Sequence, residues 1–189
     1  MASCKIAVIV GSNRRDSINR KLAQALIRLG RDGAGFELAR IDDLPMYNQD
    51  LENTPPASVV RFKGEIAAAD GLLFVTPEHS RSIPAVLKNA IDWGARPWGK
   101  NSWTGKIAAI TGASPGAIST ALAQQHLRQI LGAQGVVLSG GEAYLQFKPG
   151  LITDDGTVAD ESTRAFLEGF VDQLVAMVAR LAPTARAAA

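Results

Sequence analysis

The chain has 189 residues, of which 47% are hydrophobic and 20% charged, and its formal net charge is +2. It contains no apolar run of about 18 residues and no cleavable signal, which predicts a cytoplasmic protein without a membrane partner. The lone cysteine, Cys4, excludes an internal disulfide and cannot form a metal site by itself, so no metal is expected. The weak charge, without a Lys/Arg block, argues against nucleic-acid binding.

The first predicted elements are a strand, a polar loop and a helix. Residues 6–10 are a continuous apolar run, which is typical of a strand buried on both faces of a parallel sheet. The chain turns at Gly11, and the spacing of apolar residues from Ile18 to Leu29 predicts a helix that begins after Ser17 or Asp16. Residues 11–19 therefore lie where free amide N–H groups and a helix dipole favour an anion.

The composition of this loop narrows the kind of anion. Serine, asparagine and arginine side chains supply many donors, but GxGxxG and GxxxxGK[ST] are both absent. The loop therefore lacks the glycines that cradle a dinucleotide and the lysine that holds a triphosphate. It suits a terminal phosphate monoester; an ordinary polar connection is the alternative.

Strands and helices alternate along the rest of the chain. Further strands are predicted at 36–41, 71–76, 106–111 and 136–138, and residues 140–156 are predicted to be irregular. A second helix is expected after Thr54, with Pro55 in its first position, a third through Trp93 to a stop at Gly94, and a fourth over 118–131, ended by Gly132. The last helix should start near Asp160 and bury five apolar residues, Phe166, Phe170, Val171, Leu174 and Val178.

This alternation predicts an α/β fold with a five-stranded, doubly wound parallel sheet of order 2-1-3-4-5. The length predicts one domain over residues 1–182, with a frayed, disordered tail at 183–189. Ligands bind such sheets at the carboxyl ends of the strands, where the strand order reverses. The loops expected there are 11–19, 77–82 and 112–116.

Two motifs resemble a known family. GSNRRDSIN matches the GSxRxxSxN phosphate loop, and TPEHSRSIPAVLKNAIDW is similar to the TPEYNxSxPxxLKNAIDW segment, of NAD(P)H-dependent FMN reductases. LPMYNQD and HLRQIL bring the chain closest to the chromate and quinone reductases of that family, and the resemblance runs from about residue 6 to 178. It implies a flavodoxin-like, three-layer α/β sandwich.

The resemblance also implies non-covalently bound FMN, with NADPH or NADH as electron donor. It places Ser12, Arg14, Ser17 and Asn19 on the FMN phosphate, and Pro77, Glu78, Ser80 and Ser82 around the ribityl chain and ring. The other positions expected to contact the cofactor are Ile18, His79, Ser114 and Gly116. It further implies a homodimer or tetramer with the flavin sites at the subunit interface.

The expected function is an oxidoreductase that moves electrons from NAD(P)H through FMN to small acceptors such as quinones, chromate, azo or nitro compounds. The flavin carries the redox chemistry, so no catalytic side chain is expected, and Glu78 is interpreted as a capping or solvated carboxylate rather than a proton donor. A flavodoxin-like electron carrier and a nucleotide-binding regulatory module without turnover are the alternatives.

One departure from the motif concerns the acceptor. His79 and Ser80 replace the usual Tyr-Asn and Arg81 follows, so His79 and Arg81 are expected to contact the substrate and to favour anionic acceptors or the phosphorylated nucleotide. His126 is expected to be structural or at an interface.

Assembly is predicted from a second region. Three tryptophans, Trp93, Trp98 and Trp103, are expected to lie in a subunit interface, and Asp92 and Arg96 are expected to pair across it. The alternatives are that the tryptophans cover the monomer's own core and that the charges form an exposed ion pair.

Overall fold

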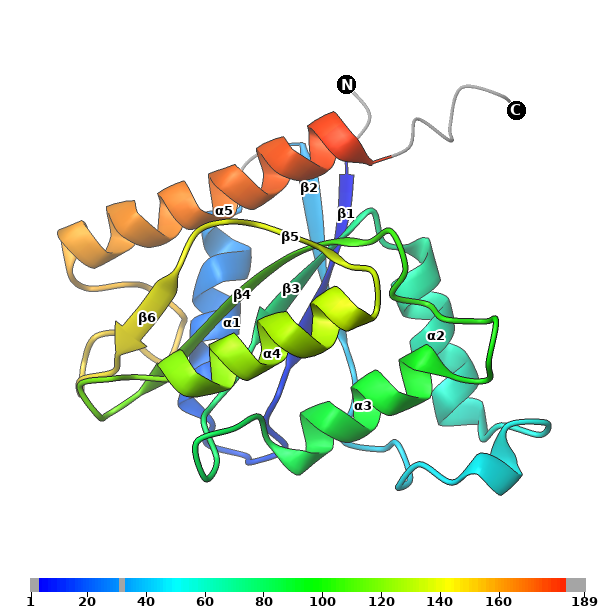
Figure 1. The fold of residues 1–189 in the computed structure, drawn as a ribbon. Coiled ribbons are helices and arrows are strands. Elements are labelled where there is room, and N and C mark those ends of the chain that lie inside the picture. The colour runs from blue at the N-terminus through cyan, green and yellow to red at the C-terminus, as the bar shows by residue number, and fades with distance from the viewer. Residues whose placement is uncertain (1–3, 31–32, 183–189) are drawn as a thin grey trace.

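The computed structural model describes residues 4–30 and 33–182, which form a parallel sheet between two layers of helices (Figure 1). The strand order is β2-β1-β3-β4-β5, as the sequence predicts, and β6 pairs with β4 outside that path. The single-domain assignment for residues 1–182 stays a prediction, and the tail at 183–189 lies outside the described residues. The strands are β1 (Cys4–Val10), β2 (Ala34–Ala39), β3 (Gly71–Val75), β4 (Ile107–Ser114), β5 (Val137–Leu138) and β6 (Ala143–Gln146).

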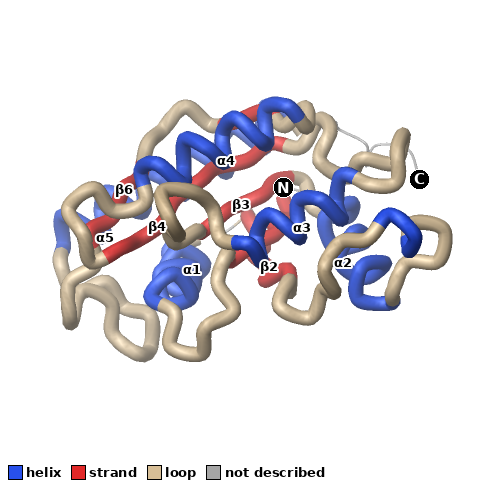
Figure 2. Tube along the Cα trace, turned by 60° about the horizontal axis from the view of Figure 1, so that its bottom comes forward, coloured by secondary structure: helices blue, strands red, loops and turns tan. Residues whose placement is uncertain are grey.

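The helices cover both faces of the sheet, so the fold is the predicted flavodoxin-like sandwich (Figure 2). α1 (Ile18–Leu29) and α5 (Glu161–Leu181) pack on the face that carries Ile6 and Val8. α2 (Ala57–Ala68), α3 (Ala85–Ala95) and α4 (Ala121–Ala133) pack on the face of Ala7 and Ile9. Adjacent residues of β1 thus face opposite cores, which explains why its sequence is apolar throughout residues 6–10.

The sixth strand corrects the expectation that residues 140–156 are irregular. β5 pairs only with the start of β4, at Ile107 and Ala108, whereas β6 pairs with its end, from Thr111 to Ser114. The strand is four residues long and only alternate side chains are buried, so its local pattern is too short to be distinguished from a loop. Only its pairing with β4 identifies this segment as a strand.

The helix starts agree with the sequence where a side chain caps them. Ser17 Oγ accepts from Arg20 N at 3.3 Å, and Asp160 Oδ1 accepts from Thr163 N at 2.7 Å. Two other starts, those of α2 and α4, are corrected. α2 begins two residues beyond the predicted Pro55, after Pro56, and α4 begins at Ala121 rather than at residue 118.

Neither predicted glycine stop ends its helix, because α3 and α4 continue to Ala95 and Ala133. Gly94 lies inside α3, where an added Cβ would lie 2.3 Å from the ring of Trp103. This glycine is therefore needed for close packing and not for a left-handed turn.

Two of the three tryptophans belong to the monomer's own core, which corrects the interface prediction for them. Trp93 and Trp103 are 1% and 0% exposed, and their indole N–H groups donate to Pro45 O at 2.8 Å and to Ile91 O at 2.9 Å. Trp98 is 90% exposed. Phe166 is also 49% exposed, although it was expected in the core.

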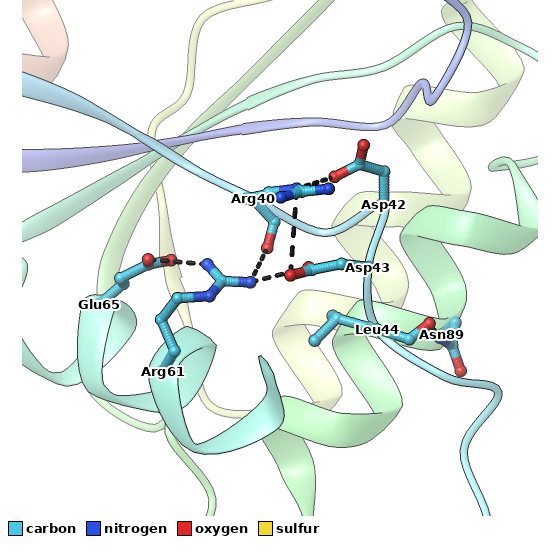
Figure 3. A network of polar contacts seen from close by, with 7 residues as sticks. All are labelled: Arg40, Asp42, Asp43, Leu44, Arg61, Glu65 and Asn89. Atoms are coloured by element: carbon cyan, nitrogen blue, oxygen red, sulfur yellow. Dashed lines mark hydrogen bonds and ion pairs between the residues drawn. The ribbon is translucent and has the colours of Figure 1, made fainter. Parts of the chain in front are cut away.

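A polar network holds the segment after β2 against the helices (Figure 3). Arg61 of α2 donates to Asp43 and Glu65, each at 2.8 Å, and to the carbonyl of Arg40 at 3.1 Å. Asn89 of α3 donates to Pro45 O at 2.9 Å and accepts from Tyr47 N at 2.7 Å. The chain at residues 40–47 is thereby fixed next to the carboxyl end of the sheet. No helix in the described ranges is long and apolar enough to cross a membrane.

Gly112→Ala should destabilise the protein because the end of β4 has no room for a side chain. A Cβ at this position would lie 2.0 Å from the carbonyl oxygen of Thr76 and 2.5 Å from Thr120 Oγ1. We expect the free energy of unfolding in urea to fall by about 1–3 kcal/mol. Gly140→Ala is the control, because a Cβ there meets no atom within 4 Å. Equal stability of the two variants would contradict this close packing.

Candidate functional site

A pocket of about 250 Å³ lies at the carboxyl ends of β1, β3 and β4, where the strand order reverses. It is formed by the three predicted loops together with one residue of α3. We call it the loop pocket, and it is lined by Gly11, Ser12, Asn13, Arg14, Ser17, Ile18, Asn19, Pro77, Glu78, His79, Val86, Ala113, Ser114 and Pro115.

The first loop presents an anion-binding helix end to this pocket. Gly11 N donates to Val75 O at 2.9 Å, which fixes the start of the loop to the neighbouring strand. The backbone N–H groups of residues 15–19 meet no acceptor within the described part of the chain. They precede the twelve-residue helix α1, so free donors and the positive end of the helix dipole point to the same place. The exposed Arg14 adds a full positive charge.

Asn19 joins this helix end to β4. The side chain is 1% exposed, its Nδ2 donates to Ala113 O at 2.9 Å, and its Oδ1 accepts from Ala113 N at 2.8 Å. Both ends of the amide are therefore used within the fold. The side chain lines the pocket. Its two hydrogen bonds to Ala113 hold the first and third loops at a fixed separation.

The second loop is a tight hairpin. His79 N donates to Ser82 O and Ser82 N to His79 O, both at 2.9 Å, and the two residues between them have φ angles of 50° and 64°. Such a two-residue turn favours Asn and Gly, because a left-handed conformation costs other residues about 1–2 kcal/mol each. Ser80 and Arg81 occupy these positions here, so the hairpin is strained at the point where it departs from the family motif.

Ser82 does not cap the following helix. α3 begins at Ala85, after Pro84, and the Ser82 hydroxyl lies 3.0 Å from Nδ1 of His126 in α4. Ser82 lines neither the loop pocket nor the neighbouring pocket described below. This contact gives His126 a structural role, which is one of the two roles expected for it from the sequence.

Glu78 links the hairpin to α4. Its side chain is 8% exposed, and Oε2 accepts from Leu122 N at 3.0 Å and from Ala123 N at 3.1 Å. Oε1 accepts from Arg81 at 3.1 Å. Thr120, the N-cap of α4, makes no capping hydrogen bond with its own side chain. Glu78 therefore caps α4 from 44 residues away, in agreement with its interpretation as a capping carboxylate.

A second pocket, of about 430 Å³, adjoins the first and shares Glu78 and Ser114 with it. We call it the hairpin pocket. Ile118 is 55% exposed there, so an apolar surface lies next to polar loop atoms. The pocket is lined by Glu78, Ser80, Arg81, Ser114, Gly116, Ala117, Ile118 and Ser119.

The two pockets together contain eleven of the twelve residues predicted to contact the cofactor; Ser82 is the exception. Sequence reasoning did not single out Val86, Ala113 or Pro115, which line the loop pocket. Their side chains are apolar and carry no chemical signal, and only their place beside the crevice could have found them. In the described ranges, no group of three or more His, Cys, Asp and Glu side chains could hold a metal ion.

Asp92 and Arg96 have partners in their own chain. Lys88 donates to Asp92 at 2.7 Å, and Arg96 Nε donates to Glu52 at 2.6 Å and to the Tyr47 hydroxyl at 3.1 Å. Hydrogen bonds from Tyr47 and then Arg96 hold the pKa of Glu52 below its ordinary value, so the carboxylate stays charged. The predicted pairing of Asp92 with Arg96 across an interface stays a prediction.

Comparison with known proteins identifies the family. The family model described as NADPH-dependent FMN reductase matches residues 4–150. A 2-hydroxy-1,4-benzoquinone reductase of a Burkholderia species is 47% identical over 92% of this chain and 96% of its own length, and a quinone reductase of Pseudomonas putida is 44% identical over 92% and 94%. The solved structure of FerB, a flavoenzyme NAD(P)H:(acceptor) oxidoreductase from Paracoccus denitrificans, is 47% identical, with a TM-score of 0.91 over 94% of this chain and 98% of that one. The chain therefore belongs to the NADPH-dependent FMN reductase family and is an oxidoreductase.

Proposed function

We propose that the protein takes electrons from NADPH or NADH through bound FMN and passes two of them to quinones and to other small acceptors, such as chromate, azo and nitro compounds. The observation that carries this proposal is the loop pocket. It combines free backbone donors, a helix N-terminus and a guanidinium at the switch point of a parallel sheet. The quinone reductases among the relatives support the choice of acceptor class.

The phosphate end of FMN suits the first loop. Ser12, Arg14 and Ser17 would hold the phosphate together with the backbone N–H groups that precede α1. A monoester dianion meets donors on several sides here, and Arg14 supplies a charge-assisted hydrogen bond. Ile18 and Asn19 complete the wall of the pocket, and Asn19 keeps the loop in register with β4.

The ribityl chain and ring suit the region around the hairpin and the third loop. FMN, when bound, supplies the redox chemistry, accepting hydride from the nicotinamide and giving electrons to the acceptor. The backbone N–H groups of Glu78 and Ser80 meet no acceptor among the described residues, so they are available to the polar edge of a ring. Pro77, His79, Ser114 and Gly116 line the same region.

A flavodoxin-like electron carrier and a nucleotide-binding module without turnover are the alternatives. A carrier that docks on redox partners is expected to have a strongly acidic surface, whereas this chain has a net charge of +2. Reduction of the bound flavin by NADPH alone separates the enzyme from a carrier, and uptake of FMN separates both from a module that does not bind flavin.

The loaded protein should be yellow and should bleach when NADPH is added without a partner reductase. In Arg14→Gln, loss of the charge-assisted contact should weaken FMN binding by about 1–3 kcal/mol, measured by fluorescence quenching on the apoprotein. Riboflavin, which lacks the phosphate, should bind the variant and the parent protein equally.

Arg15→Gln is the matched control, because Arg15 is adjacent and exposed but does not line the loop pocket. Equal losses of FMN affinity in the two variants would show a general charge effect and contradict the assigned contact. A yellow protein that does not bleach would indicate a carrier, and a protein that takes up no FMN would overturn the function.

We assign the choice of acceptor to His79 and Arg81, which are exposed at the mouth of the crevice. Arg81 is 67% exposed and bound to Glu78, so solvent screens its charge in part. Arg81→Gln should lower kcat/KM for chromate by roughly three- to tenfold and leave a neutral quinone unchanged. Arg164→Gln, at another exposed and paired arginine, is the control. The same change for both acceptors would remove Arg81 from this role.

We also propose that the protein is a homodimer or tetramer with the flavin sites at subunit contacts. Trp98 is the tryptophan that supports such a contact, since its side chain is 90% exposed beside a hollow of about 700 Å³. Trp98→Ser should weaken association, so that the solution mass falls towards that of a monomer at micromolar concentration. A monomeric mass of the parent protein with FMN retained would contradict the assembly.

A further inference from the structure

A third pocket lies on the other side of the phosphate loop, against the edge strand β2. It has a volume of about 330 Å³ and shares Ser12 with the loop pocket, so the two pockets adjoin at the loop. We call it the β2 pocket, and it is lined by Val10, Ser12, Arg20, Gln24, Leu38, Ala39, Arg40, Ile41 and Asp42. A group attached to a phosphate in the loop pocket could therefore enter the β2 pocket by passing Ser12.

One wall of the β2 pocket is apolar and uncovered. Leu38 lies beside Val8 in the sheet register, on the face that α1 covers farther in, yet it is 53% exposed because β2 is the edge strand. Val10, on the same face, borders this wall and is 8% exposed, whereas Ile41 packs in the core on the opposite face of the sheet. A flat apolar group stacked on Leu38 would cover a surface that nothing in the described chain covers.

The other wall is charged. Arg20 of α1 makes no ion pair and donates no side-chain hydrogen bond within the described residues. Asp42 accepts from Arg40 Nε at 2.6 Å, a contact drawn in Figure 3. That bond and the charge of Arg40 hold the pKa of Asp42 below its ordinary value, with a smaller contribution from the charge of Arg20, so the carboxylate remains an acceptor. The pocket thus offers a cation for a phosphate and an anion for hydroxyl or amino groups.

The position of Asp42 is informative. It follows β2 at the carboxyl edge of the sheet and lines the pocket, where its carboxylate can accept hydrogen bonds from ribose hydroxyls. The volume also reaches the lower range of small-ligand sites, about 300 Å³. The apolar side chain of Leu38, the cation of Arg20 and the carboxylate of Asp42 together match the adenine, the phosphate and the ribose of an adenylate.

We propose that the β2 pocket accepts the adenylate half of FAD while its flavin half occupies the site proposed for FMN, so that this protein binds FAD as well as FMN. The inference rests on the proposed function, because it needs the flavin phosphate in the first loop. Arg20 would meet the second phosphate, Leu38 the adenine, and Asp42 the ribose hydroxyls.

The test compares FMN and FAD binding to the apoprotein by quenching of flavin fluorescence. The parent protein should bind FAD within about tenfold of FMN. Leu38→Glu, which puts a charge on the apolar wall, and Arg20→Gln should each weaken FAD by about five- to tenfold and change FMN by less than about twofold. Leu38 is exposed, so its replacement leaves the core intact.

Two controls carry the same chemical changes elsewhere. Val60→Glu introduces a carboxylate at an exposed apolar position of α2, and Lys21→Gln removes the charge next to Arg20, where Lys21 pairs with Asp154. Both should bind the two flavins as the parent does. Equal weakening of FMN and FAD in the test variants, or unchanged FAD binding in both, overturns the proposal.

A rise in the KM for NADPH in the test variants, with FAD affinity unchanged, would assign the pocket to the adenosine of the electron donor and also overturn the proposal. Failure of the parent apoprotein to bind either flavin would instead refute the proposed function, and this inference with it. Normal FMN binding with FAD bound more than about tenfold more weakly would refute the inference alone.

Discussion

The site depends on one buried side chain, Asn19, whose amide joins the start of α1 to Ala113 at the end of β4. A buried amide that lost these partners would leave unsatisfied polar groups on both elements, at a cost of about 1–3 kcal/mol for each group. The two hydrogen bonds therefore give a specific separation to the first and third loops. The free N–H groups before α1 face the crevice because this contact holds the helix end there.

The sequence predicts the parts of this arrangement that are set locally. The apolar run of β1, the turn at Gly11 and the start of α1 lie within a short stretch and are predicted by local pattern, although the structure is needed to choose Ser17 over Asp16 as the cap. The strand order also follows, because alternating elements leave few topologies. Local reasoning fails at β6, whose four residues become a strand only because the end of β4 needs a partner. It also fails at Ser82, whose partner His126 is far away in sequence.

The three tryptophans show the same limit of local reasoning, because their sequence does not tell which of them is buried. All three lie within eleven residues and share one composition signal, so sequence alone treats them alike. In the fold, Trp93 and Trp103 point into the core, where carbonyl oxygens accept from both indoles, and Trp98 points into solvent. Burial of an indole needs an acceptor at the right place, and the positions of Pro45 and Ile91 are set by tertiary structure.

The two sides of the crevice differ in backbone strain, and this bears on how acceptor choice varies in such a fold. The first loop is fixed by the strand bond at Gly11 and by Asn19, whereas the hairpin holds Ser80 and Arg81 in left-handed conformations that their side chains disfavour. Glu78 ties this hairpin to α4, so a substitution at the hairpin tip also alters the support of that helix. Changes at residues 79–81 can therefore reshape the open side of the site, while the anion-binding end keeps its geometry.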